Sequence, residues 1–104
     1  MTDSVRIDFA SVVGFDWDRG NSVKVDKHGV TTLEAEQVFF ATPLVITPDE
    51  RHSQSEPRFR ALGKALLGRR LTVIFTLRDG ATLLRVISVR DMHRKERASY
   101  EQAT

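Results

Sequence analysis

The first apolar positions of the chain alternate with polar ones in two short segments. Residues 5–9 alternate in this way and predict a short strand, because successive side chains of a strand point to opposite faces. Phe15 and Trp17 alternate with Asp16 and Asp18, so this segment is either a second short strand or an extended lead-in to a helix.

Two helices are predicted next, each with a clear starting residue. Asp18 suits the N-cap of a helix over residues 19–27, because its carboxylate can accept hydrogen bonds from free backbone N–H groups. Residues 31–34 form a Thr-x-x-Glu capping box, which predicts a second helix that continues to about Phe40. Residues 44–47 then form a short apolar run, which we interpret as a strand.

The C-terminal half has a more regular pattern. Residues 58–65 predict a strand with one basic face, and residues 71–77 predict a more deeply buried strand. The Asp79-Gly80 pair lies between apolar runs and predicts a two-residue hairpin turn, with residues 82–90 as the return strand.

A closing helix completes the predicted fold. It covers residues 93–102. The order of the elements predicts an α+β fold, in which two N-terminal helices pack on an antiparallel β-meander with a C-terminal helix. A length of 104 residues predicts a single domain over residues 1–104.

Composition narrows the class of protein. No run of about 18 apolar residues is present, so we expect no membrane segment. Residues 1–10 are acidic and mixed, which is not typical of a signal peptide, and the chain has no cysteine. These features together favour a cytoplasmic protein.

The net charge of +2 hides an asymmetry between the two halves of the chain. Residues 1–50 contain four basic and nine acidic side chains, a net charge of −5, whereas residues 51–104 contain twelve basic and five acidic ones, a net charge of +7. This split suggests that the C-terminal half binds nucleic acid or an acidic protein. The alternative is a solvated basic surface without a partner.

The first candidate site lies on the predicted first helix. Lys24 and His28 follow Asn21 by three and seven residues and share its face, and Lys27 lies beside them. An imidazole near lysines can exchange protons near neutral pH. The alternative for His28 is a favourable interaction with the C-terminal end of the helix dipole, and for the lysines it is simple solvation.

A second candidate site lies at the start of strand 58–65. Glu56, Arg58 and Arg60 have the same parity, so they share one sheet face if the strand begins by Glu56. A carboxylate beside guanidinium groups can accept a proton and stabilise a phosphorane-like charge. The alternative is an exposed edge strand that is protected by charge.

A third group lies near the C-terminus. Arg85 and Arg90 have opposite parity, so an unbroken strand cannot direct both to one face. Arg94 near a helix start opposes the helix dipole, which is tolerable if an anion or acidic partner binds there. The alternative is plain surface charge. The whole group consists of Arg85, Arg90, His93, Arg94, Lys95, Glu96 and Tyr100.

No metal ion or cofactor is expected. Cysteine is absent, and none of the three histidines has a second histidine four residues away. The glycines form no phosphate-binding loop.

Several blocks of the sequence occur in the order typical of a known family. In chain order they are Phe15-Asp16-Trp17-Asp18, Gly20-Asn21, Lys24, Lys27-His28-Gly29-Val30, His52-Ser53, Glu56, Arg58, Leu62-Gly63, residues 73–76, Arg85, Ile87-Ser88-Val89-Arg90, Met92-His93-Arg94-Lys95-Glu96 and Tyr100-Glu101. Over roughly residues 15–101, the chain therefore resembles the BrnT-type toxins of type II toxin–antitoxin pairs.

The resemblance implies a RelE-like fold and a metal-independent endoribonuclease that arrests growth by cleaving RNA. It also implies a cognate BrnA-like antitoxin that silences the toxin. We expect toxin and antitoxin to form a DNA-binding complex, as a 2:2 hetero-oligomer, that represses its own promoter.

The resemblance also suggests roles for individual residues. The 2′-hydroxyl of RNA is expected to attack the adjacent phosphate, with Arg58 and Arg90 stabilising charge. His28 and Glu56 are the acid and the base, in either order. Tyr100 is expected to stack on a base or to assist proton transfer. The residues expected to contact RNA are Lys24, Lys27, Arg60, Arg85, Arg94 and Tyr100. We expect the site where the first helix meets the basic sheet.

A non-enzymatic function remains an alternative. A degenerate toxin would be a partner-binding module that docks a DNA-binding antitoxin and acts only in promoter autoregulation. The joint presence of His28, Glu56 and Arg58 favours the ribonuclease, because docking alone does not require these residues.

Overall fold

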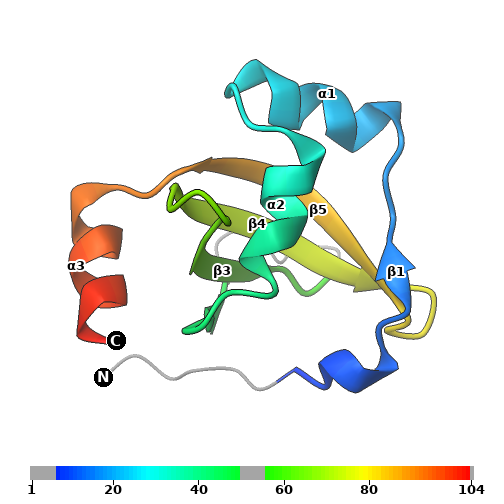
Figure 1. Cartoon of the computed structure of the whole chain (residues 1–104). Helices are drawn as coiled ribbons and strands as arrows, with labels where there is room; N and C mark the ends of the chain where they lie inside the picture. Colours follow the sequence, from blue (N-terminus) through cyan, green and yellow to red (C-terminus); the bar gives the residue numbers. More distant parts are fainter. Residues whose placement is uncertain (1–6, 50–55, 104) are drawn as a thin grey trace.

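A five-stranded sheet organises the computed structural model, which describes residues 7–49 and 56–103. The strand order is β1-β5-β4-β3-β2, and all neighbours are antiparallel except β1 and β5 (Figure 1). The strands are β1 (Gly14–Phe15), β2 (Val45–Pro48), β3 (Phe59–Lys64), β4 (Arg70–Arg78) and β5 (Leu83–Asp91). The predicted α+β fold with an antiparallel meander is confirmed, and β1 adds a parallel edge.

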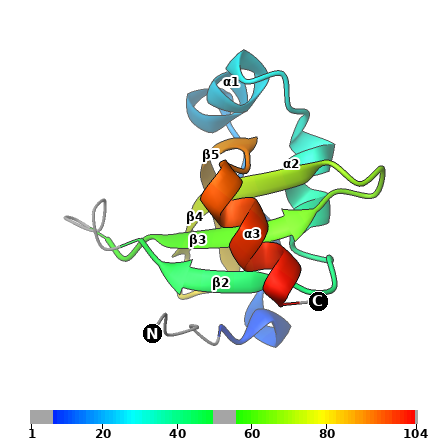
Figure 2. The ribbon, with the colours of Figure 1, turned by 90° about the vertical axis from the view of Figure 1, so that its left-hand side faces the viewer.

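Three α-helices cover the sheet. α1 (Arg19–Lys27) begins at the predicted N-cap Asp18, which also forms a capping box with Asn21, and α2 (Thr32–Val38) begins with the predicted capping box at Thr31. α1 packs on β5, and α2 packs on β3 and β4. α3 (Arg94–Gln102) lies across β2 and β3 (Figure 2). None of the helices in the described part of the chain is long and apolar enough to cross a membrane.

The buried apolar side chains form two clusters. The smaller one contains Leu62, Met92 and Tyr100, with Val45 packed against it, and it joins α3 to β3. Because side chains alternate along a strand, Leu62 faces α3 while its neighbour Gly63 faces α2. α3 and α2 therefore cover opposite faces of the sheet. The larger cluster, under α1 and α2, contains Val25, Val30, Ala35, Val38, Ile46, Ala61, Ala65, Leu71, Val73, Phe75, Leu84, Val86 and Val89.

The segment before α1 differs from the prediction. The predicted strand over residues 5–9 is not found in its described part. Residues 5 and 6 lie outside the described residues, Ile7 and Asp8 form no strand, and Phe9 begins a 3-10 helix over Phe9–Ser11. Phe9 and Val12 both pack against the core. They are three residues apart, and one turn of 3-10 helix places side chains at this spacing on the same side. Phe15 lies in β1 and Trp17 in the lead-in to α1, so each alternative applies to part of that segment.

The hairpin between β4 and β5 is longer than predicted. Arg78 pairs with Leu83, so the loop has four residues instead of two. Asp79, Gly80 and Ala81 have φ values of 56°, 65° and 67°, all in the left-handed region. The Asp79-Gly80 pair therefore marks the turn correctly, but a third left-handed residue extends it before the return strand begins.

Gly63 brings β3 close to the end of α2. A Cβ at this position would lie 2.9 Å from the carbonyl oxygen of Val38 and 3.1 Å from Cβ of Ala41. We expect Gly63→Ala to lower the free energy of unfolding by about 1–3 kcal/mol, measured by urea denaturation, because the backbone must shift. Gly14→Ala is the control, since its Cβ would meet only Leu83 Cδ2 at 3.8 Å. An equal loss in both variants would contradict this explanation.

Candidate functional site

Arginine side chains from two strands line the sheet face that contacts α3. Leu62 contacts α3 and pairs with Thr72, which also pairs with Arg90. Directly paired residues project to the same face, so Arg90 lies on the α3 side. Arg60 precedes Leu62 by two positions in β3 and shares that face. Arg58 lies just before β3, but its carbonyl oxygen accepts a hydrogen bond of 2.8 Å from the Asp49 N–H, which continues the pairing of β2 with β3 and gives Arg58 the same parity as Arg60. We call Arg58, Arg60 and Arg90 the arginine face.

Glu96, in the first turn of α3, lies between Arg60 and Arg90. The two terminal nitrogens of Arg90 donate to its two carboxylate oxygens at 2.7 and 3.0 Å. Thr72 Oγ1 donates to Oε1 at 3.0 Å, and the backbone N–H of His93 donates at 2.8 Å. Arg60 Nε lies 3.9 Å from Oε2. Glu96 therefore binds Arg90 directly and caps the helix. It shares Arg60 with the buried Asp49, whose Oδ1 also lies 3.9 Å from Arg60 Nη2.

These contacts determine the charge of Glu96. Partial burial raises its pKa, but the hydrogen bonds from Arg90, the His93 N–H and Thr72 outweigh burial and lower the pKa from 4.5 to about 2. Glu96 is therefore ionised at neutral pH and holds no proton to donate as a general acid. The side chains of Arg60 and Arg90 remain 38% and 32% exposed, so an anionic ligand can reach them.

Arg85 lies on the same sheet face but is used in a structural contact. We expected that an unbroken strand could not direct both arginines to one face, but β5 is interrupted by a β-bulge at Ile87, which restores the parity of Arg85 with Arg90. Arg85 donates to both carboxylate oxygens of Asp18 at 3.0 and 3.1 Å and lies 3.4 Å from Asp16 Oδ2. Its hydrogen bonds lower the pKa of Asp18, so Arg85 ties β5 to the N-cap of α1.

His28 and Glu56 are not brought together. Beside His28, the Gly29 carbonyl oxygen accepts a hydrogen bond of 2.8 Å from Arg69 Nη1, immediately before β4. Glu56 accepts two hydrogen bonds of 3.0 and 3.1 Å from Arg78, the last residue of β4. β4 has nine residues, so its ends are about 26 Å apart. The predicted acid and base therefore do not meet at one phosphate.

The basic residues of α1 form a separate surface. Lys24, Lys27 and His28 are exposed. Asn21 does not share their exposure, because it is buried and its Nδ2 donates to the carbonyl oxygens of Asp16 and Val86, both at 2.9 Å. Asn21 therefore holds α1 against β5 instead of contributing to a binding face.

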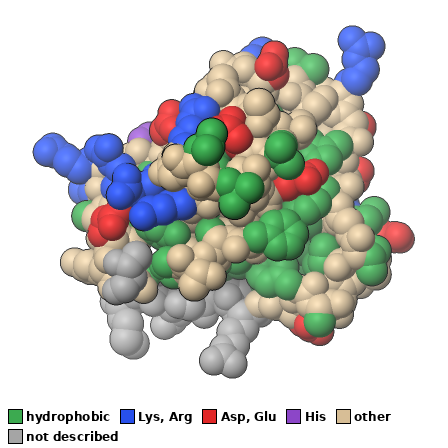
Figure 3. Space-filling model, in the orientation of Figure 1, with side chains coloured by type: hydrophobic (Ala, Val, Ile, Leu, Met, Phe, Trp, Pro, Cys, Tyr) green, Lys and Arg blue, Asp and Glu red, His purple; other side chains and the backbone are tan. Residues whose placement is uncertain are grey.

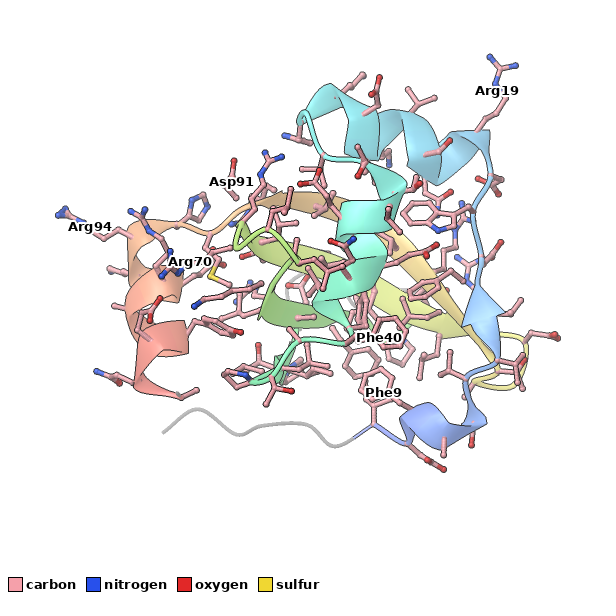
Figure 4. The ribbon with its side chains drawn as sticks, viewed as in Figure 1. Phe9, Arg19, Phe40, Arg70, Asp91 and Arg94 are labelled. Atoms are coloured by element: carbon pink, nitrogen blue, oxygen red, sulfur yellow. The ribbon has the colours of Figure 1, made fainter. Side chains whose placement is uncertain are left out.

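α3 contains both an exposed and a buried candidate. Arg94 points away from the start of the helix into solvent (Figure 4). Tyr100 has no exposed surface, and its hydroxyl donates to the Pro43 carbonyl oxygen at 2.6 Å. Burial also raises the pKa of Tyr100. The prediction that Tyr100 stacks on an RNA base is therefore wrong for this structure, in which Tyr100 anchors α3 to the segment before β2.

One family model matches residues 17–96, more than half of the chain, and describes a ribonuclease toxin, BrnT, of a type II toxin–antitoxin system. The chain belongs to this toxin family. A search of curated proteins finds no match. The toxin therefore has RNA as its substrate and a cognate antitoxin as its partner. The matched span contains the whole arginine face and ends at Glu96, so it includes the carboxylate that orients Arg60 and Arg90.

The sequence places Glu96 in the C-terminal basic group but does not reveal its role. The available signal is its position three residues after His93, which is typical of a capping box. Its other partners, Thr72 and Arg90, become neighbours only when the sheet forms. Among residues 7–49 and 56–103, no three His, Cys, Asp or Glu side chains form a group that could hold a metal ion.

The low pKa of Glu96 makes part of the stability depend on pH. Because folding lowers this pKa, the stabilisation is full above about 4.5 and is lost as the pH falls towards about 2. We expect Glu96→Gln to lower the free energy of unfolding by about 2 kcal/mol at pH 7, and by much less at pH 2. Urea denaturation at both pH values measures the difference. A loss of the same size at both would show that the charge of Glu96 is not the cause.

Proposed function

We propose that the toxin cleaves RNA on the arginine face by a transesterification that needs no metal ion. The 2′-oxygen attacks the adjacent phosphorus, the bond from phosphorus to the 5′-oxygen breaks, and the products are a 2′,3′-cyclic phosphate and a 5′-hydroxyl. The convergence of Arg58, Arg60 and Arg90 on one accessible sheet face supports this proposal most directly. Guanidinium groups held in advance stabilise the negative charge of the transition state.

We assign the proton transfers from position along the face. Glu56 precedes Arg58 by two residues, so we propose that it accepts the proton of the 2′-hydroxyl, while water protonates the leaving 5′-oxygen. Arg58 stabilises the phosphate that reacts, and Arg60 and Arg90 bind a neighbouring phosphate. We propose that three exposed basic residues of the helices contact the RNA backbone farther from the reacting phosphate. These residues are Lys24, Lys27 and Arg94.

Cleavage of a defined RNA by purified toxin tests this assignment. We expect Arg58→Ala and Glu56→Gln each to slow cleavage by about 100-fold or more, because each removes a group that acts in the transition state. His28→Gln is the control and should change the rate by less than about threefold, since the C-terminal end of α1 lies far from Glu56. A chelator should leave the rate unchanged, and the products should include a 2′,3′-cyclic phosphate.

Three outcomes would contradict the assignment. Loss of cleavage in His28→Gln alone would move the reaction centre to α1. Inhibition by the chelator would contradict the metal-independent chemistry. If the wild-type chain binds its antitoxin but leaves RNA intact, the chain is the non-catalytic module that acts in promoter autoregulation.

We infer that the antitoxin docks on the opposite side of the sheet, around Phe40. Phe40 is 80% exposed and lines two hollows, of about 340 and 420 Å³. Val13 and Leu66 each line one of them and are more than 80% exposed. Hydrophobic side chains gather on this side of the molecule, beside α2 (Figure 3). Exposed apolar surface of this kind marks an interaction site, and the family supplies the partner. We call Val13, Phe40 and Leu66 the Phe40 surface.

We expect the occupant to be an amphipathic segment of the antitoxin with its apolar face on Phe40. Lys64 lines the second hollow and favours an acidic residue at the edge of that segment. The rest of the antitoxin binds DNA, so that a 2:2 complex in the cytoplasm represses its own promoter.

Phe40→Ser tests the docking surface. We expect it to weaken antitoxin binding by at least about tenfold, because an exposed aromatic anchor is replaced by a small polar side chain. RNA cleavage by the free toxin should be unchanged, so co-expressed antitoxin should no longer prevent growth arrest. Leu33→Ser is the matched control, since Leu33 is 62% exposed but lines neither hollow. Wild-type affinity in the Phe40→Ser variant would exclude this surface.

A further inference from the structure

A groove of about 400 Å³ lies between α3 and strands β2 and β3, next to the arginine face. α3 supplies one wall, with side chains spaced at about one turn. β2 and β3 supply the floor and the other wall through side chains that alternate along each strand. The lining residues are Val45, Thr47, Arg60, Leu62, Lys95, Glu96, Ser99 and Ala103.

The two ends of the groove differ in polarity. Arg60 and Lys95 outnumber the single acidic lining residue, Glu96, so one end carries a net positive charge, and Arg60 lies 3.9 Å from both Glu96 and the buried Asp49 there. Val45 and Leu62 make the interior apolar, and both belong to the cluster that also buries Tyr100. The groove is therefore suited to a ligand with an anionic end and a flat apolar body.

Two hydroxyl groups add hydrogen-bonding capacity to the groove. Thr47 pairs with Arg60 across β2 and β3, two residues from Val45, and Ser99 projects from α3, so the groove has a hydroxyl on each of its walls. Each hydroxyl can donate one hydrogen bond and accept others, as recognition of the edge of a heterocyclic base requires.

We propose that this groove is a subsite for one nucleobase of the RNA, and this inference rests on the proposed function. The phosphate of the nucleotide binds at the cationic end beside Arg60, and its base lies on Val45 and Leu62. The hydroxyls of Thr47 and Ser99 contact the base edge. Only an unpaired base can enter such a groove, because a paired base is stacked within a helix. The substrate is therefore single-stranded RNA, and the groove contributes to the choice of cleavage position.

A matched pair of substitutions on α3 tests the subsite. Ser99→Trp fills the groove, whereas Ala98→Trp adds the same side chain to a neighbouring exposed residue that does not line it. Ser99→Trp should weaken the binding of an unpaired oligoribonucleotide and slow its cleavage by at least about tenfold, and Ala98→Trp should change both by less than about twofold. Circular dichroism and thermal unfolding of both variants check that they fold.

Binding of single nucleotides separates this inference from the proposed function. The probes are the 3′-monophosphates of adenosine, guanosine, cytidine and uridine, with inorganic phosphate as the reference, titrated against the wild-type toxin by NMR. We expect at least one nucleotide to bind about tenfold more tightly than phosphate and to shift the amide signals of Thr47 and Ser99. Thr47→Val should alter the order of preference among the four but leave phosphate binding unchanged.

The outcomes are distinct. If nucleotides bind no better than phosphate, or if Ser99→Trp binds and cleaves RNA like the wild type, the groove is not a base subsite. If Ser99→Trp weakens antitoxin binding but leaves RNA cleavage unchanged, the groove belongs to the protein interface and the inference fails. If nucleotides bind in the groove but the wild-type toxin cleaves no RNA, the subsite stands and the proposed function fails.

Discussion

The carboxylate of Glu96 accepts hydrogen bonds from β4, from β5 and from the start of its own helix. α3 has only a small apolar cluster, centred on Tyr100, to hold it on the sheet, so the polar attachment at its first turn matters for its position. The same carboxylate keeps Arg60 and Arg90 close together despite their like charge. The position of Arg90 and of the start of α3 therefore depends on one ionised side chain, while Arg60 lies between Glu96 and the buried Asp49.

The two faces of the sheet have different chemistry because their covering helices differ. α1 and α2 bury most of the core, and the chain that follows α2 leaves Phe40 exposed. α3 covers only part of the other face, where charged side chains from β3 and β5 remain accessible. A polar ligand and an apolar one thus have separate surfaces. This division is the basis on which we propose different binding sites for RNA and for the antitoxin.

Local patterns in the sequence were sufficient to predict most of the fold. Asp18 and Thr31 marked the starts of helices correctly, and alternation located the three long strands, because these signals involve residues close in the chain. The site was less predictable. A bulge at Ile87 changes the parity that alternation assumes, and the burial of Tyr100 depends on which side of α3 packs on the sheet.

The expected pairing of His28 with Glu56 failed for a related reason. Histidine and glutamate both suit proton transfer, but their identity does not show how far apart the two side chains lie in the folded chain. The contacts of Gly29 with Arg69, and of Glu56 with Arg78, place them at opposite ends of β4. Parity within one strand predicted that Arg58 and Arg60 share a face, but only the register of β3, β4 and β5 brings Arg90 to the same face.

Gly63 couples the two sides of the sheet mechanically. At this residue β3 touches the end of α2 with no space for even a methyl group, and the neighbouring Leu62 touches α3. Close-packed interiors transmit displacement because they contain few voids that could absorb it. A displacement of the chain around Phe40 therefore also displaces β3, the strand that contains Arg60. An antitoxin that binds around Phe40, as we propose, can therefore act on the arginine face through a single backbone segment without touching RNA.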